Sequence, residues 1–339
     1  MHRSEITIDL GAVRRNIRHL VTILEGSELW AVVKADAYGH GAIDVSGVAL
    51  AEGASALCVV TLAEALELRW EFPTARILIM GPLLHGEVAQ ARDAGLEIAI
   101  ADGEIPEDIR VHLKIDTGMG RFGLSEFVTP DRNVVGLMSH LATADCDLDF
   151  ALAQIERFRE LTDPYGHLVR HIANSAAVLR VPESLFDATR CGIALYGLSP
   201  FSDDPARDGL QPAFRWESRI AQVRLLEPGQ STGYGRRFIA KKPTWIGLVP
   251  VGYGDGFRRD MTGTEVLIED ERRPVVGTVS MDSIAVELER ELPVGTPVVL
   301  IGDGVLIEEH ARIAGTINYE IACGISSDRR RSRRVVIDA

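Results

Sequence analysis

The chain has 339 residues, of which 46% are hydrophobic and 25% are charged, as in a globular protein with one large or two smaller domains. Its 49 acidic and 36 basic side chains give a formal net charge of −13, which argues against a groove for nucleic-acid phosphates. Acidic residues interrupt the N-terminal region, and no later apolar run approaches the roughly 18 residues of a membrane span. We therefore expect a cytoplasmic protein that binds neither nucleic acid nor membranes.

Neither the histidines nor the cysteines have the spacing of a metal site. The nine histidines include no H-E-x-x-H motif, and the four cysteines are scattered without C-x-x-C pairs. We therefore expect no dedicated metal site and no disulfide framework. The cysteines should be buried, reduced thiols.

Eight short apolar runs, rich in β-branched residues, predict a parallel sheet in the first two thirds of the chain. Helical patterns at 61–72, 86–95 and 147–161, in which apolar residues recur every three or four positions, separate several of these runs. Buried strands joined by amphipathic helices indicate an α/β fold, a TIM-like (β/α)8 barrel. The eight runs are 29–34, 55–60, 76–80, 96–100, 110–116, 133–140, 168–173 and 185–191.

Two connections of the predicted barrel are too short for ordinary crossover helices. They are the segments 101–109 and 121–133. A connection between parallel strands usually needs about a dozen residues or more, most of them helical. We therefore expect these two outer helices to be shortened or missing.

The pattern changes after about Ser199. Period-two alternation, hairpin signals and repeated glycines predict a C-terminal all-β domain, in which 307–316 is the only helix that we predict. We therefore expect a barrel domain at 1–200 and a β-domain at 201–339. The first strand of the chain is compatible with membership of either domain.

Polar side chains follow the predicted barrel strands, at the ends where barrel enzymes have their active sites. Lys34 ends the apolar run LWAVV, where it is either a rim lysine or, with a lowered pKa, a residue suited to Schiff-base formation. Loops that open at Ser175 and Gly192 have backbone N–H groups that can bind a phosphate. These features favour pyridoxal 5'-phosphate (PLP) over a nicotinamide cofactor. The other polar strand ends are Lys114, Asp116, His140, Asn174 and Arg190.

A series of segments resembles, in order along nearly the whole chain, the motifs of the alanine racemase family. They are AVVKADAYGHG, LKIDTGMGRFG, SHLATAD, IANSAAVLR, RCGIALYG, VGYGDGF, VSMD and TINYEI. The resemblance implies a PLP-dependent isomerase with a barrel and a β-domain. Such an enzyme interconverts L-alanine and D-alanine and supplies D-alanine for bacterial peptidoglycan.

The resemblance also implies two catalytic bases. Lys34 would bind PLP covalently and then act on one face of the substrate α-carbon, and Tyr253 would act on the opposite face. Racemisation needs both, because a proton that is removed from one face must be returned to the other.

The cofactor contacts are implied in the same way. Arg190 resembles the arginine that faces the pyridine nitrogen, which stays unprotonated because arginine keeps its proton. His140 would orient Arg190 through a hydrogen bond. The phosphate contacts would be Tyr38, Ser175, Gly192, Ile193 and Tyr319, with Asn174 beside them.

Arg121 and the backbone N–H of Met281 resemble the groups that bind the substrate carboxylate. Lys114 resembles a lysine that is often carbamylated in this family, although an ordinary barrel lysine would look the same. Tyr234 and Asp145 would line the substrate entrance.

In the family the active site lies between two subunits. Tyr253, Met281 and Tyr234 belong to the predicted β-domain, so they would serve the barrel of the partner in a homodimer.

The chain departs from the family at Ser283, which follows VSMD, and in its basic tail. We interpret the run DRRRSRR at 328–334 as a solvated surface strand.

Three alternatives share part of this pattern. A related PLP decarboxylase places an acidic residue opposite the pyridine nitrogen, which Arg190 argues against. A PLP-carrying homeostasis protein of the barrel type lacks a β-domain. A serine racemase or one of broader specificity tends to have a smaller residue at the position of Tyr319, which favours alanine as the substrate.

Overall fold

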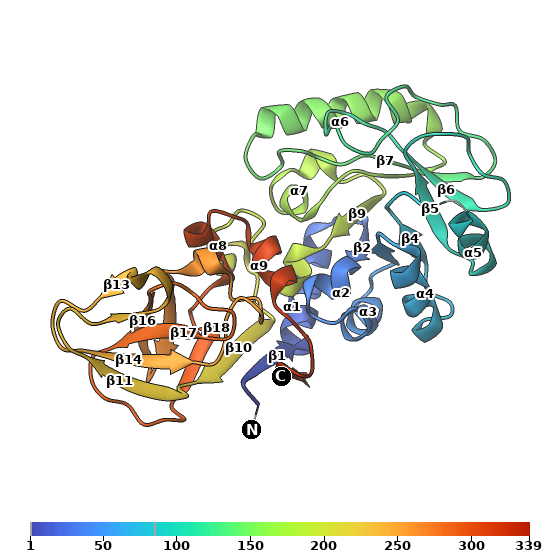
Figure 1. The fold of residues 1–339 in the computed structure, drawn as a ribbon. Helices are drawn as coiled ribbons and strands as arrows, with labels where there is room; N and C mark the ends of the chain where they lie inside the picture. Colours follow the sequence, from blue (N-terminus) through green and yellow to red (C-terminus); the bar gives the residue numbers. More distant parts are fainter. Residues whose placement is uncertain (1, 85) are drawn as a thin grey trace. The chain divides into compact units, whose positions relative to one another are not determined.

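The structure is a computed structural model that describes residues 2–84 and 86–339 (Figure 1). These residues form two compact units. The first, called here the barrel unit, comprises Val13–Phe201 and Asp208–Leu210. The second, the β unit, comprises the residues up to Ala12 together with Ser202–Arg207 and Gln211–Ala339. In the described part of the chain, no helix combines the length and the apolar composition that a membrane crossing requires.

Eight strands close the barrel, and every neighbouring pair is parallel. Each predicted apolar run overlaps one of them, and only β2 begins outside its run, by one residue, so the predicted barrel is confirmed. The strands are β2 (Glu28–Val32), β3 (Ala56–Val59), β4 (Ile77–Ile79), β5 (Glu97–Ile100), β6 (Arg110–Lys114), β7 (Val134–Met138), β8 (Val169–His171) and β9 (Ala188–Cys191).

The barrel interior explains why these strands are continuously apolar. Trp30 and Val32 of β2 point to the same side and pack in one buried cluster with side chains of β3, β4 and β9. Their outer faces are buried as well, and all four residues of β3 are inaccessible to solvent. Strands buried on both faces lose the polar alternation of a half-exposed sheet.

The helices of the barrel unit lie outside the strands (Figure 1). The three helices predicted between strands are confirmed. Thr61 begins α4 with a capping box to Glu64, and the Asp147 side chain accepts the N–H of Phe150 to begin α6. The helices are α1 (Leu10–Ile23), α3 (Ala42–Ala51), α4 (Leu62–Glu71), α5 (Glu87–Asp93), α6 (Leu148–Thr162) and α7 (Ser175–Arg180), and the short element α2 (Lys34–Tyr38) after β2 has left-handed backbone angles.

The two short connections contain no helix at all. The chain runs from β5 to β6 through 101–109, and from β6 to β7 through 115–133, in turns and irregular structure. The expectation of shortened or missing helices is therefore confirmed, since both helices are missing and not merely shortened.

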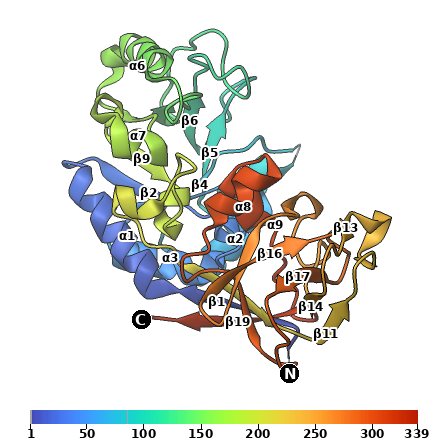
Figure 2. The same cartoon turned by 90° about the vertical axis from the view of Figure 1, so that its left-hand side faces the viewer.

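The β unit is built on a nine-stranded sheet in the order β11-β14-β17-β16-β15-β18-β10-β1-β19. The N-terminal strand β1 lies between β10, to which it is antiparallel, and the C-terminal β19, to which it is parallel. Figure 2 shows β1 beside β19. The strands are β1 (Ser4–Asp9), β10 (Phe214–Arg219), β11 (Gln222–Leu226), β14 (Thr244–Val249), β15 (Glu265–Ile268), β16 (Glu271–Val276), β17 (Ile284–Leu288), β18 (Pro297–Ile301) and β19 (Ser332–Ile337), with β12 (Ser231–Thr232) and β13 (Phe238–Ile239) as a separate pair.

Two details of the sequence interpretation are wrong. Besides the predicted helix α8 (Ile307–Ala314), the β unit contains α9 (Asn318–Gly324), which is too short to show a periodic pattern. Two of the four cysteines, Cys146 and Cys323, are exposed and not buried.

Short 3-10 helices complete the chain at Asp163–Tyr165, Pro182–Ser184, Ile193–Tyr196, Pro205–Asp208, Tyr234–Arg236 and Arg259–Met261.

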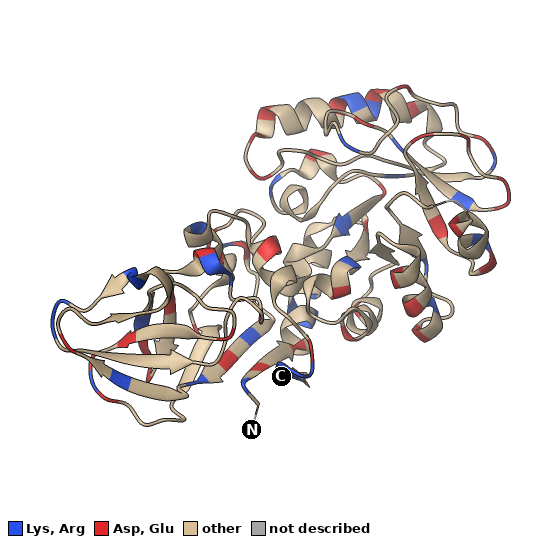
Figure 3. Ribbon diagram, viewed as in Figure 1, with Lys and Arg blue, Asp and Glu red and all other residues tan. Residues whose placement is uncertain are grey.

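Acidic and basic side chains are interspersed along the elements of each unit (Figure 3). Single-sign stripes of the kind that bind a nucleic-acid backbone are not visible on the drawn ribbon.

Candidate active site

The barrel brings the predicted polar strand ends together, because all eight strands point the same way. Lys34 follows β2 and lies two positions beyond Val32, whose side chain is inside the barrel. Lys114 ends β6, and His140 follows β7. Asn174 and Ser175 follow β8, while Arg190 lies in β9. These side chains therefore surround one mouth of the barrel.

The segment after Lys34 is a left-handed turn and not an ordinary loop. The four residues from Ala35 to Tyr38 all have φ between 51° and 54°. This conformation costs roughly 1–2 kcal/mol per residue for side chains other than glycine. Two acceptors offset the cost: the Glu64 carboxylate binds the N–H of Ala35 at 2.7 Å, and the Asp36 carboxylate binds the N–H of Ala42 at 2.7 Å. Such strain is concentrated at functional sites.

Arg190 is 4% exposed, and a fixed set of acceptors holds its guanidinium. It donates to the backbone carbonyls of Ser139, His171 and Ile172, and to the Nδ1 atom of His171 at 2.6 Å. The expected contact with His140 is present as a longer bond of 3.4 Å to Nδ1. Burial lowers the pKa of Arg190 to about 10, so it keeps its proton at neutral pH.

A buried chain of hydrogen bonds supports Arg190, and sequence reasoning missed it. His171 Nε2 lies 2.8 Å from His112 Nδ1, and His112 Nε2 lies 2.9 Å from the Glu97 carboxylate. Burial lowers the pKa of both histidines, so both are neutral. Since a carboxylate only accepts, His112 donates from Nε2, His171 donates from Nε2, and His171 Nδ1 is left to accept from Arg190. The chain thus runs in one direction from Arg190 to Glu97.

Glu97 stays ionised at the far end of this chain. Although burial alone would raise its pKa, the hydrogen bond from His112, together with the bond and positive charge of Arg76, lowers the pKa to about 2. Arg76 and Arg110 donate to its carboxylate at 2.8 and 3.0 Å. A signal was present in the sequence, because Glu97, His112 and His171 are polar residues within buried strands, where each needs a partner.

A set of hydrogen-bond donors meets near the start of α7. The Ser175 hydroxyl accepts the N–H groups of Gly192 at 3.1 Å and Ala194 at 3.4 Å, so the loops after β8 and β9 converge on it. A Cβ on Gly192 would lie only 2.8 Å from the Tyr38 hydroxyl, and Ile193 follows as a buried residue. Hydroxyl, phenol and backbone N–H groups in one small space are donors that suit a phosphate.

Asn174 has a different role from its neighbours. Its side-chain oxygen accepts the N–H of Ala177 at 3.0 Å and begins α7. Asn174 therefore orients the segment that carries Ser175.

The barrel mouth has an excess of positive charge. Loss of solvent and the cations of Arg190, Arg121 and Lys34 lower the pKa of Lys114 to about 8. Loss of solvent and the same arginines lower the pKa of His140 to about 3. Cations gathered so closely that they lower the pKa of Lys114 and His140 are arranged to receive an anion.

The loop after β6 carries Arg121, which is exposed. The Asp116 carboxylate organises this loop by accepting the N–H groups of Gly118, Met119 and Gly120 at 2.8 to 3.2 Å. Asp145, predicted at the substrate entrance, is also exposed.

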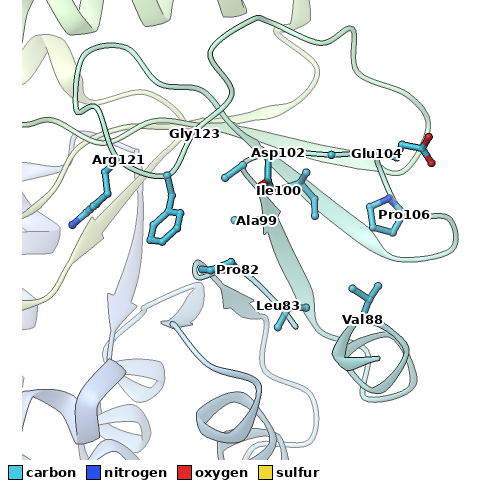
Figure 4. Close-up of a pocket in the computed structure, with 13 residues that line it drawn as sticks. Pro82, Leu83, Val88, Ala99, Ile100, Asp102, Glu104, Pro106, Arg121 and Gly123 are labelled. Atoms are coloured by element: carbon cyan, nitrogen blue, oxygen red, sulfur yellow. The ribbon is translucent and has the colours of Figure 1, made fainter. Parts of the chain in front are cut away.

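A cavity of about 410 Å³ opens where the helix after β5 is missing (Figure 4). Ala99 and Ile100 of β5 contribute apolar surface, while Asp102 and Glu104 of the following loop are charged. Arg121 lies at one side of the cavity and Glu104 at the other. The cavity therefore adjoins the loop that carries the predicted substrate arginine.

In the β unit, hydrogen bonds to backbone carbonyls link the loops that carry the predicted site residues. The N–H of Tyr253 donates to the carbonyl of Ser280, and the N–H of Gly254 donates to the carbonyl of Met281. The Thr278 hydroxyl donates to the carbonyl of Tyr234. Three loops that carry Tyr253, Met281 and Tyr234 are thereby linked. Tyr319, which is partly buried, lies in α9.

The comparisons with known proteins cover the chain from end to end. The model of the alanine racemase N-terminal domain matches residues 8–200, and the model of the alanine racemase C-terminal domain matches residues 213–335. The chain belongs to the alanine racemase family. Members of this family are PLP-dependent isomerases, and the predicted family, fold class and enzyme activity are confirmed.

Individual relatives agree with this assignment. The chain is 40% identical to alanine racemase 1 of Bacillus subtilis (strain 168), over 94% of this chain and 90% of the relative. It resembles the biosynthetic alanine racemase of Pseudomonas aeruginosa with a TM-score of 0.91, 36% identity and coverage of 99% of both chains. The alanine racemase of Bacillus anthracis, solved with bound L-Ala-P, gives a TM-score of 0.86 at 33% identity, covering 99% of this chain and 95% of that one.

Proposed function

We propose that the chain interconverts L-alanine and D-alanine by a two-base mechanism with PLP as cofactor, and thereby supplies D-alanine for peptidoglycan. The observation that carries the proposal is the cationic barrel mouth, where Arg190, Arg121 and Lys34 lie close enough to Lys114 and His140 to lower the pKa of both. An anionic cofactor and a substrate carboxylate would both be stabilised there.

The residues present fit PLP. Ser175, Gly192, Ile193 and Tyr38 would provide donors for a phosphate, and the absence of a side chain at Gly192 lets the Tyr38 hydroxyl approach this loop closely. Arg190, still protonated at its pKa of about 10, would donate toward the pyridine nitrogen and not protonate it. When bound, PLP supplies an electron sink that weakens the substrate α-C–H bond.

Lys34 and Tyr253 would each move one proton. Lys34 would remove or return a proton on one face of the α-carbon, and Tyr253 would do so on the other face. A single base would mainly return the proton to the face that it left, so the starting enantiomer would persist.

Arg121 and the backbone N–H of Met281 would bind the substrate carboxylate. Lys114, with a pKa of about 8, has a larger neutral fraction at physiological pH than an ordinary lysine, and the neutral amine is the form that reacts with carbon dioxide. A carbamate on Lys114 would place a negative charge beside Arg121 and Arg190. Tyr234 and Asp145 would line the entrance.

The functional unit in this proposal is a homodimer. Tyr253, Met281, Tyr234 and Tyr319 lie in the β unit, whereas Lys34 lies in the barrel unit. Tyr253, Met281 and Tyr234 would complete the barrel site of the partner subunit.

Chiral analysis of alanine tests the activity. PLP-loaded protein incubated with pure L-alanine, or with pure D-alanine, should bring both samples to equal amounts of the two enantiomers. Absence of interconversion by protein with bound PLP would contradict the proposal. A higher rate with serine, measured in parallel, would replace alanine by serine as the preferred substrate.

A further inference from the structure

The basic run at 328–334 contains an arginine, Arg331, that joins two carboxylates from distant loops. Arg331 Nε lies 2.7 Å from the Asp255 carboxylate, and Arg331 Nη2 lies 2.6 Å from the Asp282 carboxylate. Its neighbour Arg330 pairs with nearby Asp328 and has an 89% exposed side chain. Arg331 is thus a half-exposed member of the run, 27% exposed at its side chain, with two ion pairs that the interpretation as a solvated strand did not include.

Asp255 connects Arg331 to the loop that carries Tyr253. The Asp255 side chain is 3% exposed, and its second oxygen accepts the N–H of Gly252 at 2.9 Å. Tyr253 therefore lies between two glycines whose backbone N–H groups are hydrogen-bonded, Gly252 to the Asp255 carboxylate and Gly254 to the Met281 carbonyl. Removal of the cation that pairs with a buried carboxylate strongly destabilises a folded protein. The Arg331–Asp255 ion pair therefore stabilises the position of this loop.

Asp282 connects the same arginine to the segment of Met281, the adjacent residue. Arg331 also passes closely beneath the Tyr253 loop, since a Cβ on Gly254 would lie 2.9 Å from Arg331 Nη2. Arg3, the residue before β1, supports the arrangement by donating to the carbonyls of Pro250 and Asp282 at 2.9 to 3.1 Å.

We propose that Arg331 is a positioning residue that fixes the Tyr253 loop relative to the Met281 segment, by bridging Asp255 and Asp282. Two nitrogens of one planar guanidinium hold two carboxylates at a set separation, which a lysine cannot reproduce. The inference rests on the proposed function, in which Tyr253 is a base and the Met281 N–H binds the substrate carboxylate.

The test compares Arg331→Met with Arg330→Met, its neighbour in the same run, in PLP-loaded protein. One readout is amide hydrogen exchange by mass spectrometry over 250–256 and 280–283. The other is exchange of the substrate α-hydrogen with D2O, measured for each enantiomer. Arg331→Met should increase amide exchange in both segments and slow α-hydrogen exchange at least about tenfold more for one enantiomer than for the other. Arg330→Met should match the wild type in both readouts.

Two further variants keep the test decisive if Arg331→Met folds poorly. Arg331→Lys should give an intermediate result, and Asp282→Asn, at an exposed side chain, should loosen 280–283 without unfolding the protein. Arg331 variants that match Arg330→Met in amide exchange and in α-hydrogen exchange would overturn the inference. Failure of the proposed function is distinguishable, because the wild type would then not racemise alanine, while amide exchange would still report on the bridge.

Discussion

The two units present their site residues in opposite ways. In the barrel unit, Arg190 and Lys114 are buried. Hydrogen bonds orient the Arg190 guanidinium, and burial together with neighbouring charges lowers the pKa of Lys114. In the β unit, Tyr253 is 43% exposed and Met281 is 53% exposed, and backbone bonds between loops set their place. Substitutions in the barrel should therefore change electrostatics and cofactor binding, whereas those in the β unit should change geometry. The following predictions test that difference.

The largest effect is expected at Lys34, where the barrel supplies both the cofactor anchor and a base. Lys34→Ala should reduce racemisation by roughly 10³-fold or more, because a base in contact with the reacting carbon is lost. Borohydride reduction of the wild type, followed by peptide mapping, should place PLP on the peptide that contains Lys34. Lys241→Ala, at an exposed lysine of the β unit, should retain activity. PLP found on another lysine would contradict the assignment.

Tyr253→Phe should impair only one face of the reaction. Removal of the phenol hydroxyl should slow α-hydrogen exchange by about 10²-fold or more for one enantiomer, while the other continues to exchange through Lys34. The measurement is loss of the α-proton NMR signal in D2O, starting from each pure enantiomer. Equal slowing for both enantiomers would show that Tyr253 is not the second base.

His171→Phe tests the buried chain that holds Arg190. The ring volume is kept, but Arg190 loses an acceptor and His112 loses a donor, which should lower the free energy of unfolding by about 1–3 kcal/mol. Denaturant titration near neutral pH measures this change. The exposed His167, changed to Phe in the same way, should have little effect on stability.

The pH dependence of the same variant provides a second check. Burial lowers the pKa of His171 well below its usual 6.5, so folded His171 stays neutral while the unfolded chain takes up a proton. Stability is therefore fully present above pH about 6.5 and is lost as the pH falls below it. His171→Phe should make that loss shallower by roughly 1.4 kcal/mol per pH unit. Identical slopes would mean that His171 is protonated in the folded protein.

A smaller effect concerns Lys114. Protein equilibrated with 13C-labelled bicarbonate should show one carbamate carbon signal, because the lowered pKa of Lys114 provides a neutral amine. Lys114→Arg should remove the signal while preserving the positive charge. A signal that persists in Lys114→Arg would assign the carbamate to another amine.

Much of the barrel could be predicted from sequence, because each strand is a local apolar run and its polar end residue is adjacent. Lys34 shows this well, since the run before it forms β2 and the parallel barrel determines where it points. The left-handed turn after Lys34 was not predicted, because Ala35, Ala37 and Tyr38 carry no local signal for positive φ.

Contacts between distant segments were the part that sequence could not supply. Glu97, His112 and His171 come from three different strands, and only the closed barrel shows which nitrogen faces which oxygen. Arg331 looked like its basic neighbours because nothing in the run DRRRSRR indicates that Asp255 and Asp282 lie opposite it.

The most direct test of shared sites is to mix inactive subunits. Lys34→Ala protein and Tyr253→Phe protein are combined in equal amounts, and native mass spectrometry confirms that subunits exchange. If Tyr253 serves the barrel of the partner, half of the dimers regain one intact site, and racemase activity should return to about a quarter of the wild-type value. No recovery in samples with proven heterodimers would show that each chain uses its own Tyr253, and would contradict the shared site.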